Sequence, residues 1–136
     1  MRDITHIAVH CTATPQTTKI EDIQNYWRKN LGWKSPGYHA IVKPNGEVVW
    51  LLGLDQVSNG VKGWNSKLVN ISYIGGVDEK EKPLDNRTPA QKSALLTVLK
   101  DLKKKFPKAI ILGHRDFPKV AKACPCFNAK EEYANL

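Results

Sequence analysis

Short runs of apolar, mostly β-branched residues recur along the chain between polar segments rich in Gly, Pro and Asn. Runs of this length that are bounded by turn residues are typical of buried strands. The pattern predicts five strands, at residues 4–9, 39–43, 47–52, 69–74 and 109–112. The turn Pro44-Asn45-Gly46 joins the second and third strands as a hairpin, because Asn-Gly readily adopts the positive φ angles of tight turns.

Two longer segments carry apolar residues at helical spacing. The first predicts a helix over residues 19–30, in which Thr18 and Glu21 form a capping box. The second begins at the run Thr88-Pro89-Ala90-Gln91, which combines an N-cap threonine, a first-turn proline and a capping glutamine. Its apolar stripe continues to about residue 106, so we expect the segment to form a long helix that packs on the strands.

Asn128 and Glu131 predict the cap of a short final helix. Residues 53–68 are too long for a plain turn and are interpreted as a loop beside the strands. The sequence contains no internal repeat, linker or low-complexity segment. Strands interleaved with helices therefore predict a single domain over residues 1–136 of the α/β class, with a single mixed central β-sheet flanked by helices.

Composition and charge indicate in which surroundings the protein is made and acts. The net charge of +8 on 136 residues favours polyanionic surroundings through long-range steering, and the basic run at residues 100–108 is interpreted as a solvated helix face. Three cysteines cannot all pair within one chain, so the thiols are expected to be reduced. Because no signal-peptide or membrane-spanning apolar stretch is present, we expect synthesis in the cytoplasm without a signal peptide and no membrane partner.

Potential metal ligands occur at two distant places in the sequence. His10 and His114 each stand at the predicted carboxyl end of a strand, where side chains converge in many α/β folds. Two imidazoles and one thiolate would leave the fourth tetrahedral position of a zinc ion to water, as in catalytic zinc sites. In an extended segment Lys122, Cys124 and Cys126 share one side, so either cysteine can supply the thiolate and the lysine can stabilise an oxyanion.

A set of short motifs occurs in a fixed order between about residues 4 and 128. They are Val9-His10-Cys11-Thr12-Ala13-Thr14, Gly37-Tyr38-His39, Asn45-Gly46, Lys62-Gly63-Trp64-Asn65, Gly75-Gly76, Thr88-Pro89-Ala90-Gln91, Gly113-His114-Arg115-Asp116 and Lys122-Ala123-Cys124-Pro125. Together they resemble the zinc N-acetylmuramoyl-L-alanine amidases. That family includes phage amidases historically called lysozymes and the peptidoglycan recognition proteins.

The resemblance implies one zinc ion held by His10, His114 and Cys124. It favours Cys124 over Cys126, because Cys124 occupies the ligand position of the family before a proline. It also implies catalytic roles for Tyr38 and Lys122. The substrate would be peptidoglycan or a muropeptide, cut by a monomeric enzyme at the amide between N-acetylmuramic acid and L-alanine. Such an enzyme would act in cell-wall lysis, after release or export.

Other residues are assigned to substrate binding or to packing. Trp64 and Asn65 are expected to line the substrate groove because they lie in a matched motif, and Trp33 because of its type and position. Structural roles are expected for a further four residues, which are Cys11, Trp27, His39 and Trp50. Cys11 follows His10 directly, so it should point to the opposite face as a small buried side chain.

Three positions depart from the pattern of many relatives. Gly60 stands where they carry a histidine, and Leu68 and Asn70 stand where they carry a serine and a glycine. The substrate contacts of residues 58–70 can therefore differ from those of the relatives. Two alternatives to catalysis remain, namely a peptidoglycan-binding module of the same fold and a basic nucleic-acid-binding domain. The sequence contains no recognisable nucleic-acid-reading motif, so no specific nucleic-acid partner is expected.

Overall fold

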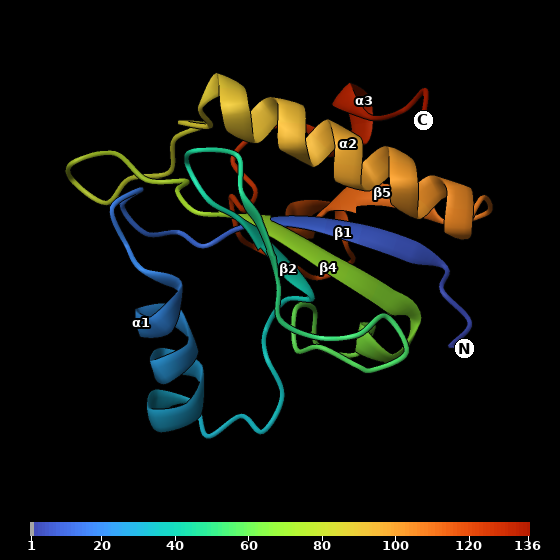
Figure 1. The fold of residues 1–136 in the computed structure, drawn as a ribbon, viewed down its shortest axis with the longest axis horizontal. Helices are drawn as coiled ribbons and strands as arrows, with labels where there is room; N and C mark the ends of the chain where they lie inside the picture. The colour runs from blue at the N-terminus through green and yellow to red at the C-terminus, as the bar shows by residue number, and fades with distance from the viewer. Residues whose placement is uncertain (1) are drawn as a thin grey trace.

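A mixed five-stranded sheet forms the centre of the protein in a computed structural model that describes residues 2–136 (Figure 1). The strands are β1 (His6–Cys11), β2 (Ala40–Val42), β3 (Val48–Trp50), β4 (Leu68–Tyr73) and β5 (Ile110–Gly113), in the order β3-β2-β4-β1-β5. Only β2 and β3 pair antiparallel, as the predicted hairpin, whereas β2–β4, β4–β1 and β1–β5 are parallel. The predicted fold class is confirmed.

Helix α2 (Pro89–Lys105) covers one face of the sheet and begins as its capping pattern predicts (Figure 1). The Thr88 hydroxyl accepts from the Gln91 amide at 3.0 Å, and the Gln91 side chain accepts from the Thr88 amide at 3.0 Å. Leu95 and Leu99 are fully buried in the cluster that α2 shares with the sheet. Burial of this apolar stripe, at about 25 cal/mol per Å², holds α2 against the sheet.

The opposite face carries α1 (Ile20–Asn25) and a π-helical turn at Tyr26–Asn30. The predicted capping box of Thr18 and Glu21 is wrong, because the helix begins one residue later with Lys19 as an N-cap that makes no side-chain hydrogen bond. The π-helical turn still places Trp27 in the core, as predicted, with 7% of its surface exposed.

Trp50 does not belong to the core, and its predicted role in core packing is wrong. Its side chain is 49% exposed at the end of β3. Strand β3 is the edge of the sheet, so it is flanked by a strand on one side only. An apolar run predicts a strand but does not show whether that strand lies at the centre or the edge of a sheet.

The C-terminal segment packs beside β5, the strand at the other edge of the sheet. Helix α3 (Ala129–Glu132) is capped by Asn128, whose side chain accepts from the Glu131 amide at 3.2 Å, as predicted. The buried Arg87 guanidinium forms ion pairs with Asp85 and Glu132, so it ties α3 to the loop before α2. Within residues 2–136 the helices are too short or too polar to cross a membrane.

Candidate metal centre

His10 lies on the face of the sheet that α2 does not cover. Side chains alternate along β1, so Val9 and Cys11 enter the core beneath α2 while His10 points to the other side. The imidazole is 1% exposed, and its Nε2 lies 2.8 Å from Oδ1 of Asn70. The Nδ1 atom faces the sulfur of Cys124 at 4.0 Å.

His114 and Cys124 reach the same place from two other segments. His114 begins a short 3₁₀ turn (His114–Asp116) directly after β5. The Asp116 carboxylate accepts from the Gly113 amide at 2.8 Å, which fixes the start of this turn. The Arg115 amide donates to the Cys124 carbonyl at 2.9 Å, so the two ligand-bearing segments are joined by a backbone hydrogen bond.

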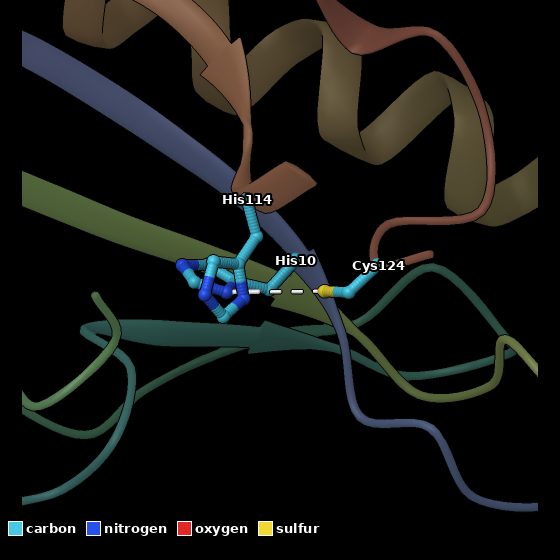
Figure 2. Close-up of side chains that lie close together, drawn as sticks. All are labelled: His10, His114 and Cys124. Atoms are coloured by element: carbon cyan, nitrogen blue, oxygen red, sulfur yellow. Dashed lines mark hydrogen bonds between the residues drawn. The ribbon is translucent and has the colours of Figure 1, made fainter. Parts of the chain in front are cut away.

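The donor atoms of His10, His114 and Cys124 all lie within 4.8 Å of one another (Figure 2). Ligands of one tetrahedral zinc ion, bound at about 2.0–2.3 Å, are separated by roughly 3.4–3.7 Å, so small side-chain rotations would close this set. Two nitrogens and one sulfur suit zinc, and three protein ligands are typical of catalytic zinc sites. The residues present therefore fit such an ion.

Burial keeps both imidazoles in the neutral form that binds metals. It lowers the pKa of His10 to about 4, against the opposing hydrogen bond to Asn70. Burial, with the neighbouring His10 and the Lys122 ammonium, lowers the pKa of His114 to about 3. At neutral pH each ring therefore keeps a nitrogen lone pair for a cation.

Cys126 turns away from this cluster, so the expectation that it shares one side with Cys124 is wrong. The segment is not extended, because the Cys126 amide closes a turn on the Ala123 carbonyl at 2.7 Å and Cys126 itself has φ +71°. Its sulfur lies 3.9 Å from that of Cys11, and burial raises the pKa of Cys126 to about 11. Cys11 is buried on the opposite face from His10, as predicted.

Tyr38 and Lys122 line the same small cavity of about 200 Å³ as the three candidate ligands. The Tyr38 ring packs against Trp27 and His10, with centroid separations of 5.3 and 4.9 Å, and its hydroxyl donates to the Cys11 carbonyl at 3.2 Å. Burial, with the nearby Cys124 and Cys11 thiols, raises the pKa of Tyr38 well above its usual value. The phenol is therefore protonated at neutral pH, while Lys122 is exposed to the cavity.

A larger groove of about 1090 Å³ continues from this cavity, and Trp33, His114 and Lys122 line both. All three expected substrate-contacting residues, Trp33, Trp64 and Asn65, line the groove. Trp64 also packs edge-on against Phe117 at 5.3 Å. The Asn65 side chain accepts from the Val61 amide at 2.7 Å, so it also shapes the loop.

Sequence reasoning missed a buried polar network beneath the cluster. Asn70 and Ser58 are both fully buried and hydrogen-bonded, and His39 is buried with them, in agreement with its expected structural role. The only sequence signal is an asparagine within the apolar run of β4, where an unpaired amide would be costly. That signal indicates a buried partner but does not identify it.

The chain is similar to known proteins over nearly its whole length. The profile of a family described as N-acetylmuramoyl-L-alanine amidase matches residues 1–127. The endolysin of Klebsiella phage KP32 is 38% identical over 131 residues, which cover 95% of this chain and 85% of that protein. The endolysin of Enterobacteria phage K11 is 41% identical over 122 residues, which cover 88% and 79%. Among solved structures, the endolysin of bacteriophage Ph2119 from Thermus scotoductus MAT2119 has a TM-score of 0.79 at 27% identity, covering 92% of this chain and 79% of that one.

Proposed function

This chain belongs to the N-acetylmuramoyl-L-alanine amidase family, and from that membership we propose that it is a zinc-dependent hydrolase of peptidoglycan. The bond cut is the amide between N-acetylmuramic acid and the first L-alanine of the stem peptide, and the activity serves cell-wall lysis. The observation that carries the proposal is the convergence of His10, His114 and Cys124 at the end of a groove, beside Tyr38 and Lys122.

The three candidate ligands would hold one zinc ion. When bound, such an ion would lower the pKa of the attacking water towards about 7 and polarise a carbonyl oxygen as a Lewis acid. The two neutral imidazoles supply nitrogen lone pairs. The Cys124 sulfur, which accepts from the Cys11 amide at 3.1 Å, supplies the third donor.

Tyr38 and Lys122 supply the remaining chemistry. The Tyr38 hydroxyl orients the attacking water, passes its proton to the departing alanine nitrogen and regains a proton from that water, since amide hydrolysis needs a protonated leaving group. The Lys122 ammonium lies beside the oxygen of the scissile carbonyl and stabilises the negative charge that develops there. Trp33, Trp64 and Asn65 bind the muropeptide along the groove.

Purified wild-type protein, Cys124→Ser and the matched control Cys126→Ser test the proposal through bound zinc and cell-wall digestion. We expect wild type and Cys126→Ser to bind about one zinc ion and to release new alanine amino groups without new reducing sugar ends. Cys124→Ser and chelator-treated wild type should lose that release.

Two outcomes would contradict this scheme. Full hydrolysis by a metal-free wild type would remove zinc from the mechanism. Tight binding of the wild-type protein to cell wall, with zinc bound and no bond cleaved, would instead identify a peptidoglycan-binding module.

A further inference from the structure

Asn70 is a polar residue at the centre of a buried strand. It pairs in register with Ala8 of β1 and is completely buried, as are its neighbours Val69 and Ile71. Those neighbours point towards α2, so Asn70 points to the opposite face, which it shares with His10. Its side-chain oxygen lies 2.8 Å from His10 Nε2.

The direction of each hydrogen bond in this network can be worked out from a backbone group. The Asn70 amide N–H can only donate, so His39 Nδ1, at 3.0 Å, accepts, and His39 Nε2 carries the proton that it donates to the Gln56 carbonyl at 2.8 Å. The Ser58 hydroxyl, 3.1 Å from His39 Nδ1, donates to the same nitrogen. The Ser58 oxygen then accepts from Asn70 Nδ2 at 2.6 Å.

This leaves Oδ1 of Asn70 facing His10. An oxygen can only accept, so His10 carries its proton on Nε2, and its Nδ1 keeps a free lone pair towards Cys124. Flipping the Asn70 amide would require the Ser58 hydroxyl to donate to Asn70, and its oxygen would then face the His39 Nδ1 lone pair at 3.1 Å. The orientation with Oδ1 towards His10 gives the Asn70 oxygen, the Asn70 amide nitrogen and the Ser58 hydroxyl a partner each.

Gly60 provides the space for the Asn70 side chain. A Cβ atom at residue 60 would overlap Cγ and Oδ1 of Asn70, far inside van der Waals contact. The φ of Gly60 lies outside the left-handed region, so the requirement for glycine here is one of space and not of backbone conformation. A side chain at residue 60 and an amide at residue 70 therefore exclude each other.

From this geometry we propose that Asn70 is a positioning residue that selects Nδ1 of His10 as the metal-binding nitrogen, with Gly60 making room for its amide. The inference rests on the proposed zinc function. Partners of this kind hold a ligating histidine in one tautomer, and their loss typically weakens metal affinity by about 10- to 100-fold.

Competition between the zinc-loaded protein and a chromophoric chelator tests this assignment. We expect Asn70→Leu to bind zinc about 10- to 100-fold more weakly than wild type. Asn70→Asp keeps an acceptor for His10 and should restore most of the affinity. Leu99→Ala, which leaves a cavity beneath α2 away from the site, controls for a general loss of stability and should keep wild-type affinity.

The Gly60 contact supplies a second comparison that does not depend on the folding of Asn70→Leu. Gly60→Ala should weaken zinc binding in the wild-type background, where the added methyl group displaces the Asn70 side chain. It should add no further loss in the Asn70→Gly background, because that side chain is then absent. Equal losses in both backgrounds would overturn the role of Gly60.

Nitrogen-15 NMR of the His10 ring in zinc-free protein gives a readout that needs neither zinc nor activity. We expect the Nε2–H tautomer in wild type and a mixture of tautomers in Asn70→Leu. The inference fails if Asn70→Leu binds zinc as tightly as a zinc-binding wild type does. It also fails if His10 of the wild type is protonated on Nδ1. A wild-type protein that binds no zinc would overturn the proposed function itself, so the two failures are distinguishable.

Discussion

The backbone amide of Cys11 lies 3.1 Å from the sulfur of Cys124 and donates a hydrogen bond to it. Two residues 113 positions apart are thus joined by a main-chain donor, while the Cys11 side chain points into the core beneath α2. The Cys124 sulfur is one of the three candidate metal-binding atoms, so the amide helps to hold it in place. The contribution of Cys11 to the cluster therefore comes from its backbone.

Cys11→Ala keeps this amide, so we expect its zinc affinity to stay close to that of wild type. Loss of the buried sulfur should lower the free energy of unfolding by on the order of 1 kcal/mol. Chelator competition and urea unfolding measure the two effects, with Cys124→Ala as the variant that should lose zinc. A Cys11→Ala protein as zinc-poor as Cys124→Ala would show that the Cys11 side chain is needed.

Lys122→Ala should retain zinc but lose turnover by about 10² to 10³, because it removes a positive charge beside the developing oxyanion. Lys122→Arg keeps the charge and should lose less. Lys100→Ala removes an exposed lysine from α2, remote from the groove, and controls for the change in net charge. Initial rates of amine release from cell wall measure the effect, and near-normal turnover in Lys122→Ala would remove this assignment.

Tyr38→Phe keeps the ring that packs against Trp27 and His10 but removes the hydroxyl group. We expect zinc binding to persist and turnover to fall by about 10² to 10⁴, the usual contribution of a general acid or base. Tyr26→Phe changes an exposed tyrosine of the π-helical turn and should leave turnover unchanged. Equal rates for both variants would show that the Tyr38 hydroxyl takes no part in the reaction.

Local patterns in the sequence predicted the elements because each depends on residues close together in the chain. The capping box of Thr88 and Gln91 and the alternation along β1 are contacts of this kind, and both are present in the structure. Alternation placed His10 on the face opposite to Cys11 without knowledge of the neighbouring strands. Its location near the end of β1 then brought it close to His114.

The remaining features depend on local turns of the backbone or on packing between distant segments. Cys126 was expected beside Cys124 because an extended backbone was assumed, and the turn from Ala123 to Cys126 reverses its direction. Gly60 and Asn70 looked like separate departures from the pattern of relatives. In the folded protein the loop that carries Gly60 packs over β4, so a side chain at residue 60 would occupy the space of the Asn70 side chain.

Arg87 offers a prediction about stability and pH. Its guanidinium, 2% exposed, makes paired hydrogen bonds of 2.8–3.0 Å to the carboxylates of Asp85 and Glu132 and lies over the Phe127 ring at 3.4 Å. Partial burial opposes ionisation of Asp85, but its hydrogen bonds and attraction to Arg87 outweigh this and lower its pKa. Hydrogen bonds from Arg87 likewise lower the pKa of Glu132.

Arg87→Met should lower the free energy of unfolding by about 2–3 kcal/mol at pH 7, since it leaves two carboxylates without their partner. In wild type both carboxylates bind protons at a lower pH in the folded than in the unfolded state, where their pKa values are about 4. The unfolded state therefore holds more protons near pH 4, and this stabilisation is lost as the pH falls through the folded pKa values. Urea unfolding at pH 7, 5, 4 and 3 should show the difference between wild type and Arg87→Met shrinking on acidification. Protonation of His10 and His114 destabilises both proteins alike and cancels in that difference, so a gap that stays constant with pH would contradict the ion-pair argument.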